Sequence, residues 1–277
     1  MDQVSKSVKD HLKDAWEIAW DTIHRFGDDD CMHLAAGIAY YSLLSMFPLV
    51  MLLTSIAAFF YEPDEATEWL VERLGDHLPV TEEFLSGALE GVHLTRGPLA
   101  AIGVIGMLFG STMAFGATMR ALNRAWGLGG RIPRSFLRSK AWEFGFLGAI
   151  AVLFLLSLAA TGLFETALEP AWWILHYVVP FVFVTSVFFL LYKFGPAIDT
   201  RWSDIWLPAV LAGVVFEGAK HIFTWYVSNL AQYSAVYGSI ATVIILLIWV
   251  YFAAGILLFG AELSYTLADR RGHVVDG

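Results

Sequence analysis

The chain has little charge and long stretches with none. Only 16% of its 277 residues are charged and 57% are hydrophobic, whereas a soluble globular chain is typically about 25% charged and about 45–50% apolar. Uncharged apolar runs of about 18 residues or more, long enough to cross a bilayer, occur repeatedly. This scarcity of charge argues against an ordinary soluble domain and predicts an integral membrane protein.

Cysteine and basic residues are also scarce. Cys31 is the only cysteine, so the chain cannot form an internal disulfide or a cysteine-based metal site. The net charge of −9 argues against nucleic-acid binding, which needs a basic face. No cleavable signal peptide is visible, because residues 1–33 hold eight acids and four bases and no early apolar core.

Catalytic motifs are missing as well. The sequence has no HExxH, no GxSxG and no P-loop, and its eight histidines are scattered along the chain. A metal-dependent nuclease would need clustered carboxylates or histidines facing solvent. We therefore expect no catalytic residues, no metal and no cofactor, and we expect that the protein is not an enzyme.

Six apolar segments predict an all-α bundle of six transmembrane helices. The predicted spans are residues 34–61, 97–119, 144–164, 170–192, 205–227 and 237–261. They form one membrane domain, 31–268, which follows an amphipathic segment, 1–30, and precedes a short tail, 269–277. No soluble domain is expected.

Lysine and arginine predict the orientation of this bundle. The segments between spans hold fourteen of these bases on one side and two on the other, and basic loops stay cytoplasmic. We therefore expect both termini on the cytoplasmic side. The acidic external segment, 62–96, is either a lid or a packed connector.

The first 26 residues predict an amphipathic helix. Apolar residues recur there at steps of three and four, which places them on one face. Flanking lysines and paired tryptophans suggest that the helix lies on the inner membrane surface. Packing on cytoplasmic loops of the same protein is an equally good interpretation. Gly27 and Asp28–Asp30 should end this helix and cap the next.

The first span contains a polar break. Tyr40, Tyr41 and Ser45 precede Pro48, and proline removes a helix hydrogen bond and clashes with the carbonyl four residues earlier. Either this kink serves helix packing, or it lines a ligand pathway as in transporters.

Polar residues also mark the predicted cytoplasmic ends of the helices. Arg120, Asn123 and Arg124 share a helical face there, and the arginines suit topology and lipid headgroups, whereas Asn123 carries no charge for that purpose. Glu262 ends the sixth span, which Tyr237 opens, and should meet Arg270, Arg271 or the basic second cytoplasmic loop. These residues are candidates for the cytoplasmic mouth or the pathway.

The stretch VFEGAKHIFTWYV is the strongest candidate for a site. Glu217, Lys220 and His221 lie inside the fifth span, where a lone charge costs about 2.5–3.5 kcal/mol. Glu217 and Lys220, at i and i+3, can neutralise one another. Ala209, Gly213, Glu217 and His221 form a stripe in which small residues admit a neighbouring helix or water. The pair either locks the bundle or binds a substrate or proton.

The combined motifs resemble one family. AAGIAYYSLLSMFPL, MRALNRAWG, LLYKFGP followed by RWSD, FEGAKHIFTWYVS, and SAVYGSIATVIILLIWVYFAAGILLFGAEL occur in this order. Together, over about residues 15–268, they resemble the YihY/BrkB family of bacterial and archaeal inner-membrane proteins. Members often bear the names ribonuclease BN or virulence factor BrkB. The resemblance implies six helices and a location in the plasma (inner) membrane of a bacterium or archaeon, but it supplies no chemistry.

Three functions follow, in order of preference. The first is a transporter or permease-like protein for a small polar or lipid-like ligand. The second is a non-transporting scaffold or envelope-integrity factor, and the last is a ribonuclease. The expected partners are the lipid bilayer and a small-molecule or lipid ligand, and not nucleic acid.

Overall fold

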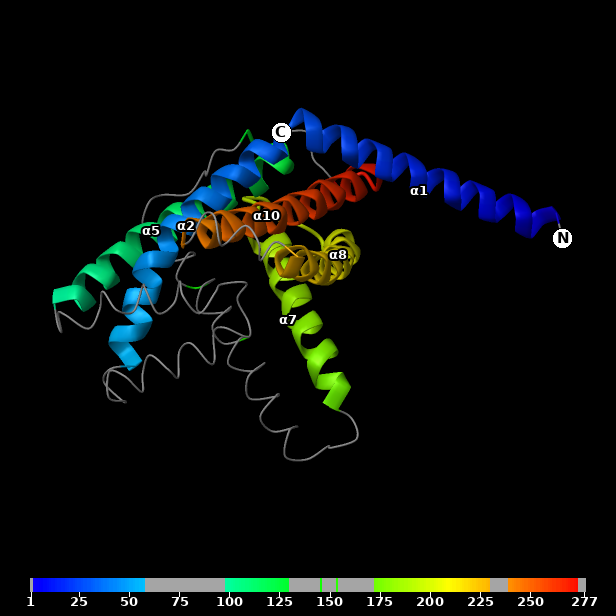
Figure 1. Cartoon of the computed structure of the whole chain (residues 1–277). Helices are drawn as coiled ribbons and strands as arrows, with labels where there is room; N and C mark the ends of the chain where they lie inside the picture. Colours follow the sequence, from blue (N-terminus) through cyan, green and yellow to red (C-terminus); the bar gives the residue numbers. More distant parts are fainter. Residues whose placement is uncertain are drawn as a thin grey trace. The chain divides into compact units, whose positions relative to one another are not determined.

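The described parts of the chain are helical. The computed structural model describes residues 2–57, 98–129, 145, 153, 172–229 and 239–273, and these contain no strand. Their helices are α1 (Asp2–Asp28), α2 (Cys31–Ala57), α5 (Pro98–Ala125), α7 (Trp172–Phe194), α8 (Trp202–Asn229) and α10 (Ser239–Arg270) (Figure 1). The predicted all-α class is confirmed. The expected third span, 144–164, apart from residues 145 and 153, the external segment and Tyr237 lie outside the described residues.

Five of the predicted spans coincide with these helices, and the largest difference is at α10. This helix continues to Arg270 instead of ending near 261. Residues 262–270 contain neither proline nor glycine, so nothing local stops the helix at Glu262. It ends where Gly272 adopts a positive φ of 66° and His273 N–H donates to the Ala268 carbonyl at 2.9 Å.

Apolar length fits a membrane location for at least two described helices. Trp202–Val227 and Val243–Arg270 are long and apolar enough to cross a bilayer, and Cys31–Met46 and Val178–Phe194 are shorter apolar helices. The number of spans and the orientation of the termini stay predictions.

The contacts divide the chain into two compact units. Unit 1 comprises Met1–Leu34, Met119–Gly218 and Gly255–Gly277, and unit 2 comprises Ala35–Thr118 and Ala219–Ala254. In unit 1, the fully buried Tyr192 of α7 donates its hydroxyl to the Leu257 carbonyl of α10 at 3.0 Å. A Cβ added to Gly260 would overlap that hydroxyl and lie 2.9 Å from Tyr192 Cζ. α7 and α10 therefore pack closely enough to require glycine.

In unit 2, α2 and α5 also pack through a glycine. A Cβ on Gly110 would lie 2.7 Å from Ser45 Cα, so the two helices can approach this closely only because the residue is small. α2 is one continuous helix through Pro48, and Figure 1 shows its ribbon changing direction along its length. Ser45 Oγ donates to the Ser42 carbonyl at 2.8 Å, so a hydroxyl binds the backbone near the bend.

Candidate functional site

A fully buried carboxylate joins three helices of unit 1. Glu262 of α10 is 0% exposed. Its Oε2 accepts a bond from Arg25 Nε of α1 at 3.1 Å, and its Oε1 accepts one from Cys31 Sγ of α2 at 3.5 Å. Because a buried charge needs paired, hydrogen-bonded surroundings, these contacts fix α1 and the start of α2 to α10.

Arg25 makes several further contacts. Its Nη2 donates to the Ala125 carbonyl at the end of α5 at 3.2 Å, and its Cζ lies 3.7 Å from the ring centroid of Tyr265. The same Nη2 is 3.9 Å from Asp29 Oδ2, and Arg124 Nε is 3.5 Å from Asp29 Oδ1. We call Arg25, Asp29, Cys31, Arg124 and Glu262 the Glu262 cluster.

A tight turn between α1 and α2 makes this cluster possible. Asp30 has a positive φ of 53°, and its N–H donates to the Gly27 carbonyl at 3.1 Å. The Asp30 carbonyl then accepts from the N–H groups of His33 and Leu34 as α2 begins. The predicted break at Gly27–Asp30 is confirmed, and it brings Arg25 and Cys31 to the same carboxylate.

Two of the three expected partners of Glu262, Arg270 and Arg271, bind other acids, and most of the third, the basic loop, lies outside the described residues. Arg270 lies eight residues after Glu262 on the same helix, about 12 Å along its axis, and it binds Asp21 Oδ2 of α1 instead, at 2.6 Å. Arg271 binds Asp204 Oδ1 at 2.6 Å. Arg25 supplies the positive charge that the sequence assigned to these two arginines.

A second buried carboxylate lies at the start of α8. Asp204 is 1% exposed and accepts bonds from Arg271 Nη1 at 2.6 Å and Ser203 Oγ at 3.0 Å, and its Oδ2 is 2.8 Å from His273 Nδ1. An acid in the first turn also complements the helix dipole. This arrangement ties the end of α10 to the start of α8.

Asn123 has a structural contact that explains its burial. It is 1% exposed, and its Oδ1 accepts from the Ala197 N–H at 2.7 Å while its Nδ2 donates to the Met119 carbonyl at 2.8 Å. The side chain thus satisfies backbone in the connection between α7 and α8. Of the two neighbouring arginines, Arg120 is exposed and Arg124 joins the Glu262 cluster.

The predicted residues of α8 are divided between the two units. Glu217, in unit 1, and Lys220, in unit 2, are half-buried, and His221 is exposed. Glu217 Oε1 is shielded from solvent. At Gly213 the small-residue stripe packs on α7, as expected. A Cβ on Gly213 would overlap Thr185 Oγ1 and lie 3.3 Å from the Phe181 ring.

The remaining predicted residues belong to α2 or fall outside the described side chains. Tyr40 is 54% exposed and Tyr41 is half-buried, and their rings meet edge to face with centroids 5.4 Å apart. The side chain of Pro48 and all of Tyr237 lie outside the described part. We did not single out Arg25 from the sequence. Its isolation could have drawn attention to it, because it is the only lysine or arginine between Lys13 and Arg73.

No cluster of metal-binding side chains is found among the described residues. They contain no group of three or more histidine, cysteine, aspartate or glutamate residues that could hold a metal ion. In both carboxylate clusters the acids instead contact guanidinium groups, which hold helices together. These contacts hold α1 and α8 to α10.

Apolar helices of membrane-crossing length, with ionisable groups buried in pairs, define a helical membrane protein. The family described as virulence factor BrkB matches residues 22–276. The chain therefore belongs to the YihY/BrkB family, as the motifs predicted.

Several relatives in this family are called UPF0761 membrane proteins. Those of Alkalilimnicola ehrlichii and Legionella pneumophila are each 29% identical and align with 94% and 90% of this chain. The chain spans only 60% and 62% of their lengths. The relative from Cronobacter sakazakii is 28% identical, over 89% of this chain and 87% of its own length. No solved structure matches the chain.

Proposed function

We propose that this membrane protein is permease-like and binds or moves a small polar or lipid-like ligand, with Glu217 of α8 at the binding position. The observation that carries the proposal is a half-buried carboxylate inside a helix long and apolar enough to cross a membrane. Glu217 lies about 22 Å from the start of α8 at Trp202 and about 18 Å from its end at Asn229, well inside the helix. Ionisable groups at such positions are functional by default.

The buried carboxylates of Glu262 and Asp204 are weaker candidates for the binding position. Glu262 binds Arg25 and lies eight residues before the end of α10, and Asp204 binds Arg271 in the first turn of α8, so both acids hold helices together. Gly213, one turn before Glu217 on α8, packs closely on Thr185 of α7, whose Oγ1 is shielded from solvent. A hydroxyl of α7 therefore meets α8 one turn before Glu217.

We propose the inner membrane with both termini in the cytoplasm as the setting. The support is the distribution of lysine and arginine in the sequence. A scaffold or envelope-integrity factor is the competing function, because the ion pairs that hold α1, α8 and α10 would serve a rigid bundle equally well.

Accessibility to water separates these two functions. A ligand path should let a water-soluble, membrane-impermeant maleimide react with Glu217→Cys in a Cys31→Ser background, with the full chain in lipid nanodiscs. Val215→Cys is the matched control, since Val215 is 54% exposed and lies on the opposite side of α8 at 100° per residue. We expect reaction at 217 and none at 215, where lipid should cover the side chain. Equal protection of both positions would favour the scaffold.

The charges themselves can be tested with a double variant. Glu217→Gln with Lys220→Met removes both members of the pair, and apolar packing can replace the stability of an ion pair but not its charge. We expect this variant to fold and to lose thermal stabilisation by compounds that stabilise the wild type in a screen of amino acids, sugar phosphates and lipid headgroups. Unchanged stabilisation by those compounds in the double variant would remove Glu217 from the site.

A further inference from the structure

The N-terminal helix presents an uncovered aromatic stripe. Trp16 is 68% exposed, Trp20 52% and Ile23 53%, and steps of four and three residues place them along one side of α1. The rings of Trp16 and Trp20 stack with centroids 6.3 Å apart. We call these three residues the tryptophan stripe.

The opposite side of α1 is held by unit 1. Thr22 is 0% exposed, and its hydroxyl lies 3.4 Å from that of Thr266. Arg25 binds Glu262. At 3.6 residues per turn these two positions point away from Trp16 and Trp20. The helix is therefore fixed by one side while the other has no partner among the described residues.

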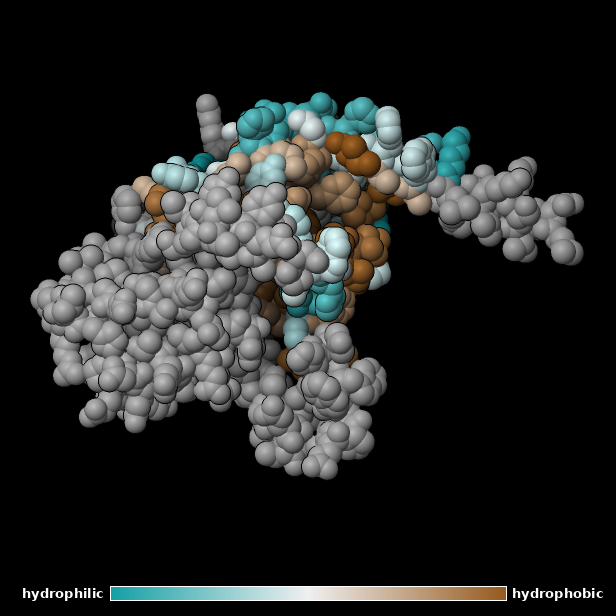
Figure 2. Space-filling view, in the orientation of Figure 1, coloured by the Kyte–Doolittle hydropathy of each residue, from teal (hydrophilic) through white to brown (hydrophobic). Residues whose placement is uncertain are grey.

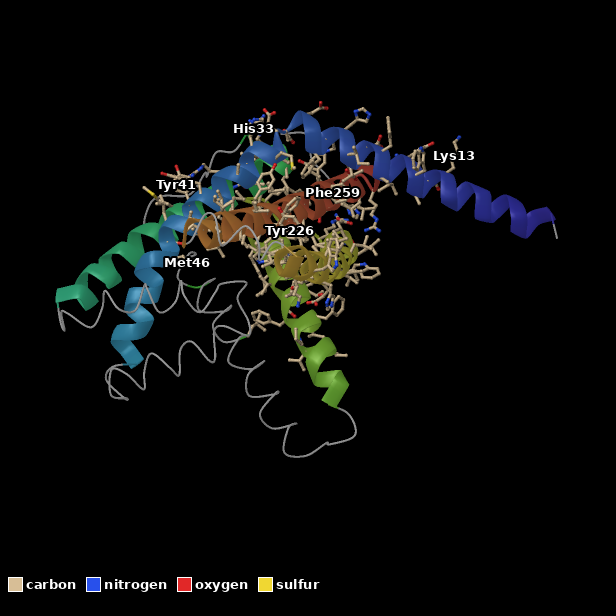
Figure 3. The ribbon with its side chains drawn as sticks, in the orientation of Figure 1. Lys13, His33, Tyr41, Met46, Tyr226 and Phe259 are labelled. Carbon is tan, nitrogen blue, oxygen red and sulfur yellow. The ribbon has the colours of Figure 1, made fainter. Side chains whose placement is uncertain are left out.

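The stripe continues onto a helix of membrane-crossing length. Phe26 adjoins the side of α1 that carries Ile23, and its ring meets Phe259 of α10 edge to face, with centroids 5.9 Å apart. Phe259 is itself 39% exposed, and Figure 3 labels it on α10. Figure 2 shows hydrophobic residues, in brown, over α10 and α8, next to hydrophilic residues, in teal, along α1. The apolar surface of α1 thus joins the surface that lipid should cover.

A second pair of exposed tryptophans lies at the start of α8, which an ion pair joins to the end of α10. Trp202 and Trp206, at the start of α8, are 56% and 53% exposed. The adjacent Arg270 and Arg271 hold α1 through Asp21 and α8 through Asp204, respectively. Tryptophan is enriched where a membrane meets water, so both pairs mark one boundary.

We infer that α1 lies in the headgroup region of the bilayer, with the tryptophan stripe inserted among the lipids. The acidic residues Asp14, Glu17, Asp21 and Asp28 occupy the sides of the helix away from the stripe and face water or Arg270. Because that polar surface is acidic, apolar insertion supplies the attraction, and anionic lipids are not needed. α1 is thereby an interfacial anchor whose level is set by α10.

Collision of a spin label with oxygen or a nickel chelate tests this placement. The full chain, with Cys31→Ser, is placed as single copies in nanodiscs of phosphatidylcholine alone, and a nitroxide is attached to Ile23→Cys or, independently, Trp20→Cys. Asp14→Cys is the control, because Asp14 is exposed on the acidic side. We expect labels at 23 and 20 to collide preferentially with oxygen, which dissolves in lipid, and the label at 14 to collide preferentially with the chelate, which stays in water.

Two results would overturn the inference. Chelate access at 23 and 20 equal to that at 14 would place the stripe in water. Protection of 23 and 20 from both reagents would mean that protein, and not lipid, covers the stripe. A single copy per nanodisc prevents a second molecule from supplying that cover. The test does not depend on whether the protein transports a ligand.

Discussion

Substituting Arg25 should lower the stability of the protein more than substituting its partner Glu262. Arg25→Met leaves Glu262, which is 0% exposed, without its guanidinium partner, while the Cys31 thiol stays at 3.5 Å. Breaking a buried pair in this way costs about 3–5 kcal/mol of stability. The substitution also removes the bond to the Ala125 carbonyl and the contact over Tyr265.

Glu262→Gln should be milder. Glutamine keeps the shape and one oxygen, and the side chain of Arg25 is 30% exposed, so its charge stays partly hydrated. Arg25 also retains the Ala125 carbonyl at 3.2 Å and Asp29 at 3.9 Å. Loss of one charged hydrogen bond costs about 1.5–3 kcal/mol, which is below the expected effect of Arg25→Met.

The double variant shows how much of the destabilisation comes from an unpaired buried charge and how much from lost packing. With Arg25→Met and Glu262→Gln together neither charge of this pair remains, so the double variant should be more stable than Arg25→Met alone. Lys13→Met is the control, because Lys13 is an exposed base on the same helix (Figure 3) and should change stability by no more than about 0.5 kcal/mol.

Reversible unfolding in mixed detergent micelles, followed by circular dichroism, gives the order of the four proteins. The expected order of destabilisation is Arg25→Met, then the double variant and Glu262→Gln, then Lys13→Met. The reasoning fails if Glu262→Gln destabilises as much as Arg25→Met, or if the two single effects simply add in the double variant. Either result would mean that Arg25 does not neutralise a buried carboxylate.

Three further predictions concern packing, topology and chemistry. Gly260→Ala should destabilise by about 1–3 kcal/mol because its Cβ overlaps the Tyr192 hydroxyl, whereas Gly255→Ala, with nothing within 4 Å, should not, as detergent melting will show. Reporters fused after Asp76 should register outside the cell and those after Arg134 or at the C-terminus inside; an external C-terminus would contradict the six-span topology. Purified protein freed of soluble nucleases should not cleave RNA, and cleavage abolished by a substitution in a folded variant would show a catalytic centre that the sequence hides.

Helix positions could be predicted because they follow from local properties. An uncharged run of sufficient length is helical in a bilayer whatever surrounds it, since the backbone must satisfy its own hydrogen bonds. The turn at Gly27–Asp30 was likewise readable from its residues. The end of α10 was not, because a charged residue such as Glu262 ends an apolar run without ending a helix when a partner from elsewhere neutralises it.

The site residues depended on contacts that no local pattern encodes. Arg25 and Glu262 are separated by 237 positions, and Asn123 and Ala197 by 74. Spacing rules for helices relate residues three or four apart, so they could pair Glu217 with Lys220 but could not find these partners. The sequence correctly singled out Asn123 as unexplained, yet its role required knowledge of where the α7–α8 connection lies.

The arginines at the predicted inner boundary combine two roles that the sequence treats as one. Their number predicts orientation, while in the structure Arg25, Arg124, Arg270 and Arg271 each contact an acid on another helix or in the turn between helices. Neutralising one of them should therefore lower stability as well as shift the charge balance. Exposed bases such as Lys13 should act on orientation alone, because topology counts a charge wherever it is attached, whereas a helix contact needs its geometry.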